Sequence, residues 1–119
     1  MEFKIEMAND VVVLIPTGNL VASETESLKS QVEKLMEKKF RLILLDMSRI
    51  DFMDSSGLGS VIAVNKLVTG AGGVFACAAL QEGVRKVFRV TRADQKITVA
   101  ETQSDGLMQI QERLLHGKG

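Results

Sequence analysis

Two adjacent hydroxyl groups, those of Ser55 and Ser56, stand out because a carboxylate precedes them and a glycine follows them. Asp54 comes after an apolar run typical of a strand, and the residues from Gly57 onward begin a run typical of a helix. The first turn of a helix has free backbone N–H groups and a partial positive charge, so it tolerates an added anion. A serine hydroxyl at this position is therefore a candidate acceptor for a phosphoryl group.

The same residues have a simpler interpretation as a helix cap. The side-chain oxygens of serine and aspartate accept hydrogen bonds from the N–H groups of a first helical turn, which makes both residue types common at helix starts. Spacing alone favours this interpretation, with Ser55 or Ser56 as the capping residue.

The sequence lacks the familiar catalytic arrangements. It has no G-x-S-x-G, G-x-x-x-x-G-K-[ST] or H-E-x-x-H pattern, and Gly57-Leu58-Gly59 lacks the third glycine of a dinucleotide-binding loop. A serine hydrolase would have to use His116, which lies in a predicted terminal tail and so cannot be held against a nucleophile. A single cysteine, Cys77, and a single histidine exclude an internal disulfide and a Cys/His zinc site within one chain. We therefore expect no enzymatic activity, no metal and no cofactor.

The hydrophobic pattern predicts strands that alternate with helices. The expected strands lie at residues 3–7, 11–15, 41–47, 74–80 and 97–99, and the expected helices contain residues 28–36, 58–68, 84–88 and 107–114. The segment from Ser23 to Glu26 matches a capping box, Thr102 or Ser104 should cap the last helix, and Pro16 should end the second strand or place it at an edge. This order predicts an α/β fold: a mixed four- to five-stranded sheet with an antiparallel first hairpin, packed with about four helices.

Length and charge limit the functional classes further. The 119 residues suit a single domain, with a core at about 3–115 and a flexible tail at 116–119. Fifteen basic residues balance fifteen acidic ones, so we expect neither nucleic acid nor an anionic membrane as partner. The sequence shows no apolar run of membrane-spanning length and no leader peptide, and the simplest expectation is a cytoplasmic protein.

The segment Phe52-Met53-Asp54-Ser55-Ser56-Gly57-Leu58-Gly59 resembles the signature of the STAS domain, and specifically that of bacterial anti-sigma factor antagonists. Other features follow the order of that family, namely Gly18 after the second strand, the helix from Leu28 to Met36, the strand from Leu42 to Asp46, Gly72-Gly73, and Val87-Phe88. The resemblance extends over about residues 3–115 and implies a STAS-like fold.

The resemblance also implies a phosphorylation switch. In this family the serine directly after the aspartate is phosphorylated, which here is Ser55, while Ser56 is the expected cap. The alternative is an exchange of these roles, with Ser56 as the phosphorylated residue. The kinase is the anti-sigma factor itself, a protein with a histidine-kinase-like ATP-binding fold. The unphosphorylated antagonist binds this kinase and so frees a sigma factor, and a metal-dependent serine phosphatase reverses the modification.

The expected binding surface combines one segment with one loop. The segment comprises Asp54, Ser55, Ser56, Gly57, Leu58, Gly59 and Ser60, and its glycines are expected to let the backbone of a partner come close. The loop is expected around Gly18 and Asn19.

The chain departs from the family pattern at Val21, where many members carry an aspartate, and this leaves the docking of the kinase open. Pro16 and the polar stretch at 91–95 also differ from the pattern. One alternative is a non-catalytic STAS module in another signalling or transporter-associated complex, in which the serine pair mainly caps the helix. Another is a small-ligand site at the helix start, although the nearest downstream basic residue is Lys66.

Overall fold

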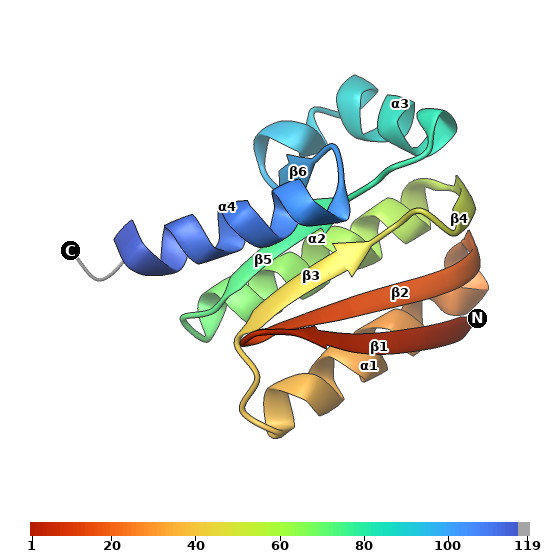
Figure 1. The fold of residues 1–119 in the computed structure, drawn as a ribbon. Helices are drawn as coiled ribbons and strands as arrows, with labels where there is room; N and C mark the ends of the chain where they lie inside the picture. The colour runs from red at the N-terminus through yellow and green to blue at the C-terminus, as the bar shows by residue number, and fades with distance from the viewer. Residues whose placement is uncertain (117–119) are drawn as a thin grey trace.

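The computed structural model describes residues 1–116 and contains alternating strands and helices (Figure 1). The strands are β1 (Glu2–Ala8), β2 (Val11–Leu20), β3 (Leu42–Asp46), β4 (Ile50–Met53), β5 (Val74–Ala78) and β6 (Thr98–Ala100). The helices are α1 (Thr25–Glu37), α2 (Ser55–Gly70), α3 (Glu82–Val90) and α4 (Gln103–His116), with short 3-10 helices η1 (Ala22–Glu24) and η2 (Ala93–Gln95). No helix in the described range is long and apolar enough to cross a membrane.

The flexible tail expected at 116–119 stays a prediction. Its first residue, His116, is the last residue of α4. The remainder of the expected tail, residues 117–119, lies outside the described residues.

A six-stranded sheet forms the centre of the fold. Its strand order is β1-β2-β3-β5-β6, and β4 pairs with β2 beside this path. The β1–β2 hairpin is antiparallel and the other strand pairs are parallel. The predicted mixed α/β architecture is therefore confirmed, and β4 is the strand that the hydrophobic pattern did not predict.

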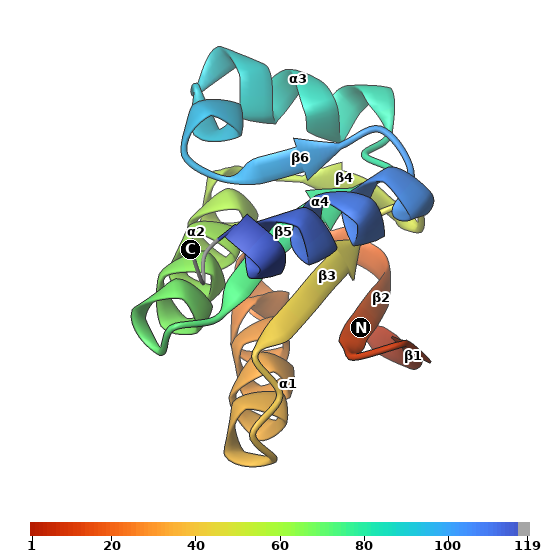
Figure 2. The same ribbon diagram turned by 60° about the vertical axis from the view of Figure 1, so that its left-hand side comes forward.

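Helices cover both faces of the sheet, because alternate residues of the central strands enter two separate cores. The larger core joins α1, α2 and α3 to one face through Leu28, Val61 and Phe88. The smaller core contains Ile110 of α4, which lies in front of the sheet in Figure 1, opposite α1 and α2. Figure 2 shows α3 above β4 and β6, so the last part of the chain encloses the sheet at that end.

Strand β2 changes its parallel partner halfway along. Residues 12–14 pair with β3, and residues 18–20 pair with β4 after a bulge between Gly18 and Asn19. The prediction that Pro16 ends this strand or lies at an edge is wrong, since Pro16 is buried inside β2. Proline has no N–H group, but here it lies between the two parallel-paired segments, where neither β3 nor β4 pairs with it.

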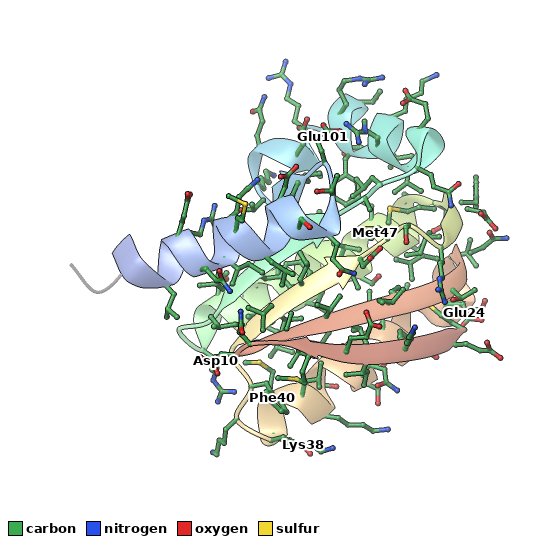
Figure 3. All side chains as sticks on the ribbon, in the orientation of Figure 1. Asp10, Glu24, Lys38, Phe40, Met47 and Glu101 are labelled. Atoms are coloured by element: carbon green, nitrogen blue, oxygen red, sulfur yellow. The ribbon has the colours of Figure 1, made fainter. Side chains whose placement is uncertain are left out.

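The predicted capping box before α1 is also wrong. Ser23 belongs to η1, and α1 has Glu24 at its N-cap position without a side-chain cap hydrogen bond. The Glu24 carboxylate instead lies 3.2 Å from the terminal amine of Met1, and Figure 3 labels Glu24 at this end of the sheet. At the last helix the prediction is confirmed, because Thr102 Oγ1 accepts a hydrogen bond from the Asp105 N–H at 3.1 Å.

Candidate functional site

Asp54 joins β4 to α2 and caps the helix. Its Oδ1 accepts a hydrogen bond from the Gly57 N–H at 2.8 Å, and its backbone is extended, with φ −101° and ψ −175°. Ser55 and Ser56 are the first two residues of the helix, so the prediction that one of these serines is the cap is wrong. The physical reason is position: β4 ends at Met53, and only Asp54 has the extended backbone that an N-cap requires.

Both serine side chains lie on the surface. Ser55 and Ser56 are exposed, and neither hydroxyl takes part in the side-chain hydrogen bonds found within residues 1–116. The first turn of α2 carries no acidic residue, and its free N–H groups favour a negative charge. The fold therefore leaves both hydroxyls available to a phosphoryl donor at a helix end that tolerates the product.

The two serines differ in what they face. Ser56 lines a groove of about 390 Å³ between α1 and α2, to which α1 contributes Thr25, Glu26 and Lys29. Ser55 is not among the lining residues. A group attached to Ser56 would therefore meet α1, whereas a group attached to Ser55 would stand at the open end of α2.

Three residues of the predicted binding segment lie beneath the surface. Gly57, Leu58 and Ser60 are buried, and Leu58 packs into the larger core. The Ser60 hydroxyl donates a hydrogen bond to the Gly57 carbonyl at 2.6 Å. These residues therefore pack at the start of α2, and of the three Ser60 also lines the groove that Ser56 lines. Their part in partner binding stays a prediction.

The two glycines of the segment have different surroundings. A Cβ atom on Gly57 would overlap the carbonyl oxygen of Leu20 in β2 and would lie 2.9 Å from the carbonyl carbon of the same residue. A Cβ atom on Gly59 would meet nothing within 4 Å. Gly57 thus allows close packing of α2 on β2 within the chain, and only Gly59 offers open space to another molecule.

Gly18 and Asn19 lie in β2, so the predicted loop at these residues is wrong, while their part in partner binding stays a prediction. The Gly18 N–H donates a hydrogen bond to the Arg49 carbonyl at 3.2 Å, and Gly18 has a φ of +125°, which favours glycine at this bulge. Asn19 is exposed and adjacent to the site. Val21, where the family pattern has an aspartate, is half-buried, and its carbonyl accepts the Glu24 N–H at 2.8 Å.

Phe52 belongs to the exposed surface beside the serines, and the sequence prediction of the surface did not include it. It pairs with Asn19 across β4 and β2, two residues before Asp54, and 55% of its area is exposed. Strand alternation would place Phe52 on the same face as Ile50, which is fully buried, so the sequence pattern points to burial instead. No signal in the sequence alone marks this aromatic ring as exposed.

Comparisons with known proteins agree with this architecture. A family model described as the STAS domain matches residues 2–106. A relative in Thermotoga neapolitana, named "Putative anti-sigma factor antagonist TM1081 homolog", is 30% identical over 112 residues, which are 93% of this chain and 99% of that protein.

Solved structures show the same fold. The crystal structure of a protein described as a "putative anti-sigma factor antagonist" from Thermotoga maritima has a TM-score of 0.85 at 26% identity and covers 92% of this chain and 94% of its own. The Bacillus cell fate determinant SpoIIAA in its phosphorylated form has a TM-score of 0.68 at 22% identity, with 92% and 99% of the two chains covered. The resemblance found in the sequence is thus confirmed, and the chain belongs to the STAS domain family.

Proposed function

We propose that this chain is a cytoplasmic anti-sigma factor antagonist that is controlled by phosphorylation of Ser55. The unphosphorylated form binds an anti-sigma factor that is also a serine kinase with a histidine-kinase-like fold, and this binding releases a sigma factor. The kinase transfers the γ-phosphoryl group of ATP to Ser55 Oγ and leaves ADP, after which the complex separates. A metal-dependent serine phosphatase hydrolyses the phosphoester, so ATP and metal belong to the partners.

The exposed hydroxyl of Ser55 at the start of α2 is the observation that carries this proposal. Because Asp54 caps the helix, the fold does not depend on the Ser55 hydroxyl. A phosphate at this point is also compatible with the helix dipole. The relatives from Thermotoga neapolitana and Thermotoga maritima are each named as a "putative anti-sigma factor antagonist", which supports the same assignment.

The proposed docking surface includes an aromatic ring. Phe52 is exposed, as are its strand partner Asn19 and the α2 residues Ser55 and Gly59. Aromatic side chains in the middle of an interface commonly carry much of the binding free energy. A phosphate on Ser55 would have to lose its water at this surface next to the carboxylate of Asp54, and an unpaired buried charge easily supplies the roughly 2.8 kcal/mol of a hundredfold loss.

The alternative is a STAS module in another signalling or transporter-associated complex, with the serine pair as a helix cap. The cap formed by Asp54 removes the structural role that this alternative gives to the serines. Phosphorylation by a purified histidine-kinase-like partner, and its loss in Ser55→Ala, separates the two functions.

The binding test compares matched aspartate variants by calorimetry against the cognate kinase. Ser55→Asp should weaken binding at least tenfold while its melting temperature stays close to that of the unmodified chain. Ser104→Asp is the control, because Ser104 is the exposed second residue of another helix, α4. Full-strength binding by Ser55→Asp, or mass spectrometry that maps the phosphate of protein from its own cells to another residue, would refute the proposal.

A further inference from the structure

Strand β1 forms an open edge of the sheet. Within the described residues it pairs with β2 alone, so one side of its backbone has N–H and C=O groups without a strand partner. Ile5 and Met7 are 49% and 53% exposed along this edge. Figure 3 labels Asp10, in the hairpin turn after β1, and Glu24, which binds the terminal amine before it.

The two faces of β1 differ in character. Ile5 and Met7 lie on the same face as their β2 neighbours Leu14 and Val12, which belong to the larger core. Lys4 and Glu6 lie on the opposite face and form an ion pair at 3.4 Å. An added strand would therefore meet one apolar row and one row with charges of both signs.

We propose that two copies of this chain associate through their β1 strands, antiparallel, about a two-fold axis that passes Ile5. Such a contact continues the sheet from one copy into the other and satisfies the free backbone groups of both edges.

Charge and length of overlap together select this register among those that a two-fold axis perpendicular to the sheet allows. An axis at Phe3 would place Glu2 opposite Lys4 but would align only residues 1–5, and an axis at Met7 would align only residues 6–8 of the strand. An axis at Ile5 aligns the whole of β1, from Glu2 to Ala8. An axis at Lys4 would place lysine opposite lysine and Glu2 opposite Glu6. An axis at Glu6 would place glutamate opposite glutamate. With the axis at Ile5, Lys4 of each copy lies opposite Glu6 of the other, and the two isoleucines meet at the centre. Charged residues on an edge strand usually discourage pairing, but in this register both cross-strand ion pairs are attractive.

The same register would cover the exposed side chain of Met7. It places Met7 of one copy opposite Phe3 of the other on the apolar face. Phe3 lines a groove of about 380 Å³ between β1 and α1, to which α1 contributes Ser27, Gln31 and other polar residues. The flexible Met7 side chain of the second copy suits such an irregular groove.

This dimer leaves the proposed phosphorylation site open. Ser55 follows β4, and β4 pairs with β2 at residues 18–20, beyond Thr17, where the pairing of β2 with β1 ends. The self-association of the chain can therefore be tested without a kinase, and its outcome is independent of the proposed function.

The test uses two charge variants of the whole chain, Lys4→Glu and Glu6→Lys, in analytical ultracentrifugation. A single-strand contact belongs to the weak class of interfaces, so concentrations run from about 10 μM to about 1 mM. The unmodified chain should dimerise. Each variant alone should dimerise about tenfold more weakly or worse, because both cross-strand pairs become like-charged. An equimolar mixture of the two variants should recover the dimer, because every cross-strand pair is again of opposite charge.

The mixture isolates the contact between copies. Each variant has lost its own Lys4–Glu6 ion pair and does not regain it in the mixture, so recovery cannot come from a change within one chain. Ile5→Lys should also abolish the dimer, whereas the control Val90→Lys, at an equally apolar residue of α3 that is 71% exposed, should not. A monomeric unmodified chain at about 1 mM, unchanged dimerisation of the single variants, or no recovery in the mixture would each overturn the proposal.

Discussion

A pair of glycine substitutions in the first turn of α2 separates packing from binding. Gly57→Ala introduces a Cβ atom that overlaps the Leu20 carbonyl oxygen and lies 2.9 Å from its carbonyl carbon. Both contacts are to backbone, so no side-chain rotation relieves them and α2 must move away from β2. Gly59→Ala makes the same chemical change two residues later, where a Cβ atom meets nothing within 4 Å.

The two variants should change stability in opposite directions. Overpacking of this kind costs about 1–3 kcal/mol, and a shift of α2 also weakens the Asp54–Gly57 cap, which adds about 0.5–2 kcal/mol. Together these contributions span about 1.5–5 kcal/mol, and we expect Gly57→Ala to lower the free energy of unfolding by the middle of that range, about 2–4 kcal/mol. Gly59→Ala should raise it by up to about 1 kcal/mol, because alanine is the better helix former.

Thermal unfolding followed by circular dichroism measures both effects. For a chain of this length, about 2–4 kcal/mol corresponds to a fall in melting temperature of roughly 8–16 °C, and the gain in Gly59→Ala to a rise of roughly 4 °C. Equal melting temperatures for Gly57→Ala and the unmodified chain would show that α2 does not pack on β2 as described. A fall of similar size in both variants would show that loss of glycine at either position is harmful for another reason.

Two further predictions concern a surface residue and a core residue. Phe52→Ala should weaken binding of the cognate kinase at least tenfold with little change in melting temperature, because Phe52 is 55% exposed on the strand that leads to Ser55. The calorimetric control is Met108→Ala, at another exposed apolar residue, on α4. Equal affinity of the two variants for the kinase would contradict the proposed surface. Cys77 is fully buried, and burial raises the pKa of its thiol because the thiolate is the charged form. Ellman's reagent should therefore react with Cys77 at pH 8 only in the unfolded chain, and rapid reaction in the folded chain would show that the β5 core is open to solvent.

The fold was predictable because its long elements carry strong hydrophobic patterns. Two apolar runs predict central strands that are covered on both faces. They are Leu42 to Leu45 and the small residues around Cys77. β4 could not be predicted in the same way, since its four residues show no clear alternation and its pairing depends on which part of β2 is free. Pro16 was wrongly predicted to end the strand or lie at an edge because the change of partner along β2 is a tertiary feature. The preference of proline for strand ends and edges takes no account of that change.

The site was predictable as a segment but not residue by residue. Asp54, Ser55 and Ser56 are all good capping residues, and local preference cannot choose among three in a row. The choice follows from where β4 ends, which is a tertiary property. The burial of Gly57 is equally invisible in the sequence, because it depends on the approach of Leu20, a residue far away along the chain.

The cap formed by Asp54 has a consequence for how information is stored under the proposed function. Asp54 caps α2 without help from the Ser55 hydroxyl, and Gly57 lies against β2. A phosphate on Ser55 would therefore not remove the helix cap. The two states would then share one backbone conformation and differ only in the phosphoryl group. The phosphorylated state would last as long as the phosphoester. Its lifetime would be set by the phosphatase and not by a conformational change of this chain.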